Sequence, residues 1–290
     1  MRTLKQIYPA LRDDIADLQT RRPLPGPGLQ QVDPFLFLNH HGPQVYGPNN
    51  RGLPFGPHPH RGFETVTFIL KGNLAHHDTG GHESVIEAGG VQWMTAGSGL
   101  IHSEVSPAAF KKAGGDLEIL QLWVNLPAKL KMHAPQYTGA QAEQIPTVEI
   151  AGGKGRLNLI SGTFNDPGGR AAAAGSLTGP IESLTGIFMS TLTLDAGATV
   201  ILPSPRARSV FLYLVSGKAQ IDARDVPKYS LVTLNHDGDE FEITALEACT
   251  FLFGHADVIG EAVVSHGPFV MNTRQEIIEA IQDYEDGKFG

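Results

Sequence analysis

Glycine and proline recur at short intervals along this chain, and their spacing limits the fold more than any other feature of the sequence. The 290 residues include 34 glycines and 20 prolines, spread as turn punctuation and not gathered into one low-complexity block. Between them stand short apolar or alternating runs, as at 65–70, 91–95 and 117–124. Such runs, bounded by Gly-rich turns, are typical of β-strands. The pattern predicts an all-β chain whose strands form barrels or sandwiches.

The strand rhythm occurs twice, which predicts two similar barrels. A Gly-, Ala- and Pro-rich stretch at 163–180, expected to be a long loop, precedes the second set of strands. We expect the domains to be 1–135 and 136–290, with 127–146 as the linker, and the length also suggests about two domains. The predicted strands are 65–70, 84–87, 91–95 and 117–124 in the first half, and 186–194, 198–202, 209–215, 219–221, 230–234, 240–243 and 249–253 in the second.

One helix is predicted, at the end of the chain. Thr273 stands three residues before Glu276, which is the spacing of a capping box. Ile277, Ile281 and Tyr284 then recur at the helical period, and Gly287 marks the end. We expect this helix to dock for stability.

Charge and composition exclude several classes of protein. The formal net charge is −8 and no basic run is present, which argues against direct nucleic-acid binding. No stretch approaches the ~20 apolar residues of a membrane span, and the first residues lack the apolar run of a signal peptide. We therefore expect a cytoplasmic protein with no membrane association. The single cysteine, Cys249, stands in an apolar stretch and is expected to be a buried small hydrophobe.

Two pairs of residues, each containing histidine, are the candidate metal ligands. His58 and His60 stand two residues apart, as do His102 and Glu104. Residues i and i+2 of a strand face the same side, so each pair presents two ligands together. Either pair alone is weak support for a metal site, but two pairs on neighbouring strands would bring four ligands to one point. Imidazole and carboxylate together suit a first-row transition metal and would leave coordination positions open for substrate or dioxygen.

Three motifs make the chain resemble the pirin family of the cupin superfamily. Residues 56–67, GPHPHRGFETVT, resemble the first cupin motif, and residues 92–104, QWMTAGSGLIHSE, resemble the second, both in the form found in pirins. Residues 267–273, GPFVMNT, resemble the end of a pirin chain. The resemblance covers nearly the whole sequence. It implies two antiparallel, jelly-roll-like cupin barrels face to face, with a short C-terminal helix.

The resemblance also implies a metal site confined to the N-terminal barrel. The motif match carries the ligands onto His58, His60, His102 and Glu104. The implied cofactor is one divalent transition metal, iron in most of the family, with manganese, nickel, copper or zinc as alternatives. Glu64 occupies the position of the usual cupin carboxylate ligand, but in pirins the ligand is the Glu after the second-motif His. A role beside the ligands or a structural role is therefore expected for Glu64.

Two further segments bear on the site. His40 and His41 replace the acidic and aromatic residues of many pirins, and either is a candidate substrate contact or a plain loop histidine. In the second half, the first motif is expected at 205–209, with Arg206 and Arg208 in place of ligands, and His236 stands alone nearby. We expect no metal in the second barrel.

The resemblance implies an enzyme like the quercetin 2,3-dioxygenases of the family. The partners would be a small aromatic flavonol and dioxygen, and Glu104 would accept the hydroxyl proton of the substrate if it loosens from the metal. A monomer is expected. The alternatives are a redox-sensitive protein that regulates a transcription factor or a metabolic enzyme, and a metal-binding cupin with a different substrate, since cupin folds host many reactions.

Overall fold

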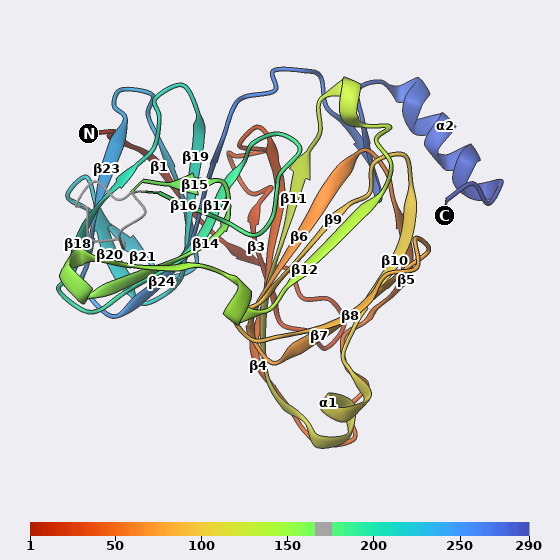
Figure 1. The fold of residues 1–290 in the computed structure, drawn as a ribbon, viewed down its shortest axis with the longest axis horizontal. Helices are drawn as coiled ribbons and strands as arrows, with labels where there is room; N and C mark the ends of the chain where they lie inside the picture. The colour runs from red at the N-terminus through yellow and green to blue at the C-terminus, as the bar shows by residue number, and fades with distance from the viewer. Residues whose placement is uncertain (166–175, 290) are drawn as a thin grey trace. The chain divides into compact units, whose positions relative to one another are not determined.

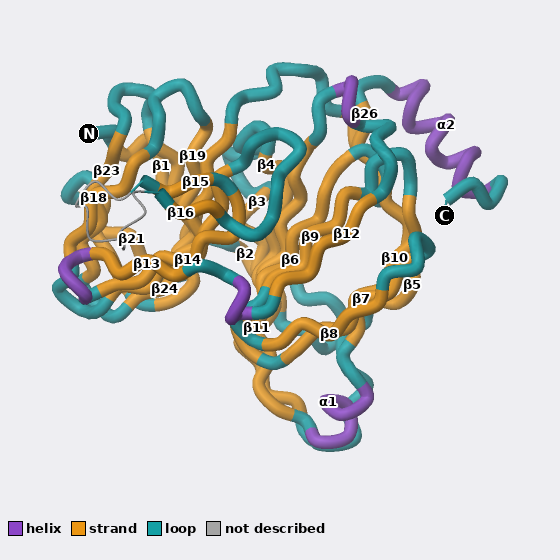
Figure 2. The backbone as a smooth tube through the Cα atoms, in the orientation of Figure 1, coloured by secondary structure: helices purple, strands orange, loops and turns teal. Residues whose placement is uncertain are grey.

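The computed structural model of the chain describes residues 1–165 and 176–289, which form two compact β units (Figure 1). The first barrel contains Arg12–Arg22, Phe35–Ala142 and Ile259–Gly290. The second barrel contains Met1–Leu11, Pro23–Pro34 and Glu143–Val258. Strands make up most of the described backbone of each unit, and helix is confined to short segments (Figure 2). The predicted all-β fold class is confirmed.

The first barrel has a large and a small antiparallel sheet as its walls (Figure 1). The large sheet has the order β12-β9-β6-β11-β4-β3-β2, and the small sheet has the order β5-β10-β7-β8. The strands are β2 (Leu11–Arg12), β3 (Thr20–Leu24), β4 (Phe35–Tyr46), β5 (Phe55–His60), β6 (Phe63–Lys71), β7 (Asn73–Asp78), β8 (Glu83–Glu87), β9 (Val91–Thr95), β10 (Leu100–Val105), β11 (Gly115–Asn125) and β12 (Gln136–Ala140), with β25 (Val264–His266) pairing β26 (Phe269–Met271).

The second barrel repeats this plan strand for strand. Its large sheet has the order β1-β22-β19-β24-β17-β14-β13, and its small sheet has the order β18-β23-β20-β21. Thus β18 takes the place of β5, β23 that of β10, and β24 that of β11. The strands are β1 (Leu4–Pro9), β13 (Thr147–Ile150), β14 (Gly155–Ser161), β17 (Phe188–Leu194), β18 (Thr199–Pro203), β19 (Ser209–Ser216), β20 (Lys218–Ile221), β21 (Arg224–Pro227), β22 (Ser230–Leu234), β23 (Glu240–Ala245) and β24 (Cys249–Ala256), with β15 (Thr163–Phe164) pairing β16 (Leu177–Thr178).

Alternation along the strands places an apolar core inside each barrel. In the second barrel this core includes Leu212 and Leu214 of β19 together with Phe251 and Phe253 of β24. Cys249 is buried in the same core, as expected. In the first barrel the core includes Ile69, Leu74, Leu117 and Ile119, and it fills only part of the interior. Polar residues occupy the rest of that interior.

Two segments differ from the sequence prediction. The expected linker at 127–146 contains β12, which pairs with β9, together with short 3-10 turns at Ala128–Leu130 and Ala142–Gln144. Of the loop expected at 163–180, residues 166–175 lie outside the described residues, and its flanks pair as β15 and β16.

The chain also crosses between the units more than once, which differs from a single boundary between residues 135 and 136. β1 joins the second barrel because it pairs with β22. The C-terminal segment joins the first barrel because Arg61 bridges Phe269.

The predicted C-terminal helix is α2 (Arg274–Glu285). Thr273 and Glu276 form the expected capping box, with the side chain of each residue accepting from the backbone N–H of the other. A short helix that the sequence did not predict, α1 (Ala108–Ala113), follows β10. In the described part of the chain, neither helix has the length and apolar character needed to cross a bilayer.

Lys131 ties three parts of the first barrel together. Its ammonium donates to the carbonyl oxygen of Gly62 at 2.8 Å, to Oδ1 of Asn125 at 2.7 Å and to the carbonyl oxygen of Val270 at 3.0 Å. The side chain is buried. Burial lowers its pKa from the ordinary 10.5 to about 8. These three bonds join the β5–β6 turn, the end of β11 and β26.

We expect Lys131→Ala to destabilise the protein. The substitution leaves three buried acceptors without a donor, at a combined cost of about 3 kcal/mol. Urea unfolding followed by tryptophan fluorescence measures this change. Lys129→Ala is the matched control, because Lys129 is exposed on the same 3-10 turn. Equal stability of the two variants would contradict the structural role of Lys131.

The lowered pKa of Lys131 predicts a pH dependence of stability. Between about pH 8 and 10.5 the unfolded chain binds a proton at this amine that the folded chain has released. The free energy of unfolding should therefore rise with pH across that window. The test is the difference between the wild type and Lys131→Met, which cancels other titrating groups. A difference that stays flat from pH 8 to 10.5 would refute the expectation.

Candidate metal centre

The two predicted ligand pairs lie on neighbouring strands of the small sheet of the first barrel. His58 and His60 are on β5, and His102 and Glu104 are on β10. The strands are antiparallel, and His102 stands directly opposite His58. Each of the three histidines offers a ring nitrogen, and these nitrogens lie within 4.8 Å of one another. Three of the four predicted ligands, His58, His60 and His102, therefore converge.

Backbone carbonyls orient two of the rings. Nδ1 of His58 lies 2.7 Å from the carbonyl oxygen of Gly56, and Nδ1 of His60 lies 3.3 Å from that of Pro268. An N–H on Nδ1 satisfies each contact and leaves the Nε2 lone pair available. A carbonyl that holds the remote ring nitrogen in this way is the usual arrangement around a histidine metal ligand.

Burial keeps all three rings in the neutral form that a metal requires. It lowers the pKa of His58, lowers that of His60 to about 3, and lowers that of His102 well below its ordinary value. Neither ring nitrogen of His102 has a hydrogen-bond partner among the described residues, although the ring is buried. A buried imidazole without partners is costly unless something binds it. The donor set therefore fits a divalent transition metal.

Glu104 is buried beside the histidine cluster but is held by other residues. Thr67 Oγ1 donates to Oε1 at 2.7 Å, and Gln121 Nε2 donates to Oε2 at 2.5 Å. Burial raises the pKa of Glu104 to about 7, against the lowering effect of these two bonds. Its oxygens do not belong to the group of mutually close ligand atoms, which contains the three histidines.

Glu64 lies on the other face of β6. Thr67 reaches Glu104, so the odd-numbered residues of β6 face the histidine cluster and Glu64 faces away. Its carboxylate instead accepts from Thr95 Oγ1 at 2.7 Å, on the neighbouring strand β9. Burial raises the pKa of Glu64. Glu64 therefore has a structural role, as the hydrogen-bond partner of Thr95 on β9.

His40 and His41 point to opposite faces of β4. His40 Nε2 lies 3.0 Å from Oε1 of Glu118, in a buried pair. His41 Nδ1 lies 2.8 Å from Oγ1 of Thr20, and its ring stands 5.2 Å from that of Phe55. Both histidines are fully buried, so neither is a plain loop histidine.

Aromatic rings line the barrel beside His60. Trp123 stacks on Phe37 at 4.6 Å between centroids and tilts against Phe63 at the same distance. Its ring meets that of His60 edge to face at 5.4 Å. Nε1 of Trp123 is buried and has no acceptor in the described chain. This aromatic wall was not predicted, although the alternation of Trp123 with Gln121 on β11 was a usable signal.

The C-terminal segment holds the ligand turn in place, which the sequence analysis also missed. The backbone N–H of Val270 donates to the carbonyl oxygen of Arg61 at 3.0 Å, and Arg61 Nη1 binds Asp283 of α2 at 2.8 Å. Gly62 has φ = +88°, and a Cβ there would lie 2.0 Å from the carbonyl oxygen of Val270. Only glycine fits this turn without displacing β26.

The second barrel lacks an equivalent ligand set within the described ranges. The strands that replace β5 and β10 place Val200, Leu202, Phe241 and Ile243 in the apolar core. The Arg206 segment, where the first motif was expected, lies in the turn after β18 and offers arginines in place of ligands.

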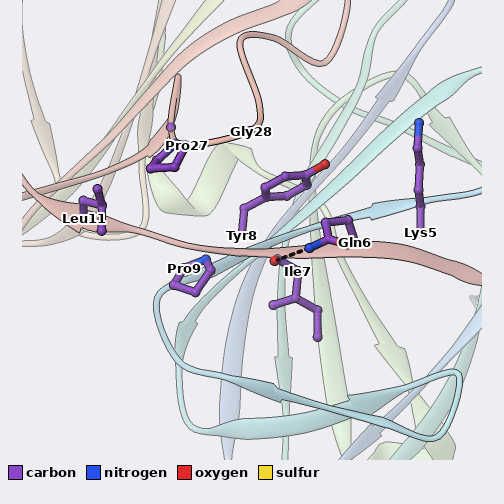
Figure 3. Close-up of a pocket in the computed structure, with 9 residues that line it drawn as sticks. Lys5, Gln6, Ile7, Tyr8, Pro9, Leu11, Pro27 and Gly28 are labelled. Carbon is purple, nitrogen blue, oxygen red and sulfur yellow. Dashed lines mark hydrogen bonds between the residues drawn. The ribbon is translucent and has the colours of Figure 1, made fainter.

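A groove on the second barrel offers no metal chemistry. Its volume is about 540 Å³, and Tyr8 and Ile7 leave β1 on opposite sides (Figure 3). No histidine or carboxylate lines it. The lining residues are Lys5, Gln6, Ile7, Tyr8, Pro9, Leu11, Gly26, Pro27 and Gly28.

Comparisons with known proteins agree with the motifs. The family model described as Pirin matches residues 17–124, and the model described as the Pirin C-terminal cupin domain matches residues 189–290. A pirin-like protein of Caulobacter vibrioides is 37% identical over 276 residues, covering 95% of this chain and 94% of that protein. Pirin of Homo sapiens is 34% identical over 278 residues, covering 94% of this chain and 88% of its own.

A solved structure matches the whole fold. The crystal structure of a quercetin 2,3-dioxygenase from Acinetobacter baumannii superposes with a TM-score of 0.91 at 31% identity. The match covers 100% of this chain and 99% of that one. The full length of both barrels is therefore shared.

The geometry predicts which substitutions remove metal. We expect His58→Ala and His102→Ala to lower the metal content per chain by about tenfold or more, since each deletes a converging donor. Glu64→Gln should retain metal because Glu64 faces away from the cluster. Elemental analysis of the purified proteins measures this, with His77→Ala as the control on an exposed histidine. Loss of metal in Glu64→Gln would contradict the geometry.

Proposed function

Because the chain belongs to the pirin family, we propose that it is a metal-dependent dioxygenase acting on flavonols such as quercetin. The observation that carries the proposal is the convergence of three neutral histidines, the half-buried His58 and the buried His60 and His102, beside a buried carboxylate and an aromatic wall. The name of the Acinetobacter relative supports this class of substrate, since the two chains match over their full length.

The proposed cofactor is one iron ion held by His58, His60, His102 and Glu104. When bound, the metal supplies Lewis-acid polarisation of the substrate oxygens and an electronic link to dioxygen. The three histidines need not release a proton before they bind the metal, because burial already keeps their rings neutral. Glu104, buried beside them and held by Thr67 and Gln121, would supply the carboxylate of the set.

Glu104 is also the proposed proton acceptor. A flavonol binds through its 3-hydroxyl and adjacent carbonyl, and the hydroxyl proton passes to a carboxylate oxygen of Glu104. Thr67 and Gln121 fix the carboxylate in the barrel, so the acceptor does not have to be ordered when the substrate arrives. The buried position keeps the proton from exchanging with bulk water.

The aromatic wall provides the substrate contact. Phe37 and Trp123 are half-buried, so their rings offer apolar faces to a flat flavonol, and Phe63 backs them. The buried indole N–H of Trp123 is a donor ready for a substrate oxygen. An apolar lining with a few placed polar groups is the usual form of a small-molecule site.

Oxygen uptake tests the proposal directly. Iron-loaded protein of confirmed metal content should consume dioxygen when quercetin is added, and Glu104→Gln should slow this by about 10² or more. Lys129→Ala, a substitution of an exposed residue, is the control for activity lost during purification and assay. Metal-replete wild-type protein that takes up no oxygen with quercetin or with a small panel of flavonols would reject the proposal.

A further inference from the structure

The second barrel places cationic and imidazole groups where the first barrel has its aromatic wall. In the first barrel Trp123 of β11 pairs with Phe37 of β4. In the second barrel the matching strands β24 and β17 pair His255 with Phe188 at the same place. The two rings stack at 4.6 Å with an angle of 4°, so the aromatic contact is kept while one ring becomes a hydrogen-bonding imidazole.

His255 is a buried ring with unused hydrogen-bonding capacity. It is 6% exposed, and its Nδ1 has no partner within residues 1–165 and 176–289. Burial, together with the charges of Arg208 and Arg2, lowers the pKa of the ring to about 3. The imidazole is therefore neutral at pH 7 and able to donate one N–H.

Arg2 brings a guanidinium to the same end of the barrel. The side chain is 2% exposed. It donates to the carbonyl oxygen of Asn235 at 2.6 Å, to that of Pro205 at 3.2 Å and to that of Arg208 at 3.0 Å. Its Nη2 is buried and has no acceptor in the described part of the chain. A fully buried arginine with an unused N–H is rare unless an acceptor binds there.

Arg208 adds a second guanidinium through the turn between β18 and β19. Its Nη2 donates to the carbonyl oxygen of Gly186. Its buried Nε lies 3.4 Å from Oδ1 of Asp257 but makes no hydrogen bond with it. The side chain of Asp257 is 78% exposed, so this carboxylate neutralises the guanidinium only weakly.

The other nearby carboxylates are already occupied. Asp237 accepts from the backbone N–H and the hydroxyl of Thr3. Asp239 forms an exposed ion pair with Arg206, the neighbour of Arg208 on the same turn. Within the described residues, Arg2 Nη2, Arg208 Nε and His255 Nδ1 thus have no hydrogen-bond partner. They lie on a buried Arg2, an Arg208 whose side chain is 17% exposed, and a buried His255, and charge-assisted bonds to an anion would satisfy them.

We propose that this end of the second barrel is a binding site for a small carboxylate, held by Arg2, Arg208 and His255. The two oxygens of a carboxylate can accept from Arg2 Nη2 and Arg208 Nε, and its single charge suits two arginines that exposed aspartates partly neutralise. Phe188 forms an apolar wall beside the donors, which favours an acid with an apolar or aromatic body over inorganic phosphate. The site is separate from the histidine cluster and does not depend on the proposed oxygenase activity.

Calorimetric titration of the full-length protein tests the site with benzoate, acetate and inorganic phosphate as probes. We expect saturable binding of one benzoate per chain, weaker binding of acetate, and the weakest binding of phosphate. Arg208→Gln and His255→Phe should each weaken benzoate by about tenfold or more, since each removes a donor to a charged group. His255→Phe keeps the ring stack on Phe188, so its fold is protected.

Two controls make the result decisive. Arg206→Gln removes an arginine from the same turn without touching the proposed donors and should leave benzoate affinity unchanged. His102→Ala, which disrupts the histidine cluster, should also leave it unchanged. The proposal is overturned by the absence of saturable carboxylate binding, by tighter binding of phosphate than of benzoate, or by benzoate binding that survives in both Arg208→Gln and His255→Phe. If Arg208→Gln does not fold, Arg208→Lys and His255→Phe decide the same question.

Discussion

The attachment of the C-terminal strand to the turn between β5 and β6 is the contact on which the candidate metal centre depends. Pro268 orients the ring of His60, Val270 bonds the backbone of Arg61, and Lys131 binds the carbonyls of both Gly62 and Val270. The strand β5, which carries His58 and His60, lies at the edge of its sheet. Without these bonds, the turn that follows it would not be held. These bonds fix it from the far end of the sequence, so the imidazoles are positioned before any metal arrives. Preorganisation of this kind is what a metal site requires of its supporting residues.

The same strand plan supports two different interiors. In the first barrel the positions that face inward on β5 and β10 hold imidazoles and a carboxylate, and Thr67 and Gln121 bind the carboxylate. In the second barrel the corresponding strands carry Val200 and Phe241 in the apolar core. The polar groups of the proposed carboxylate site lie at the end of the barrel instead, around His255. A β-barrel permits this because its fold depends on alternation and turns, whereas the identity of each inward side chain is free to vary.

Much of this architecture could be predicted from local signals. Strands of period 2 between Gly turns, the capping box of Thr273 and Glu276, and the two ligand pairs on neighbouring strands are all present in the structure. Glu64 shows where such reasoning stops. The motif match suggests a place near the ligands, but a turn at Arg61 and Gly62 separates β5 from β6, and Glu64 bonds Thr95 on the face away from the cluster. Face assignment by counting is valid only within one uninterrupted strand.

The sequence by itself determined the fold class, the family and the residue types of the histidine cluster, because these depend on short-range patterns that survive without knowledge of distant contacts. The tertiary structure decided which groups surround that cluster. Three contacts join residues far apart in the chain: β26 pairs with the ligand turn, Lys131 enters among three acceptors, and Arg2 bonds the backbone of Arg208. No local pattern encodes such contacts, since each arises only when packing brings the two segments together and burial makes an unsatisfied donor or acceptor costly.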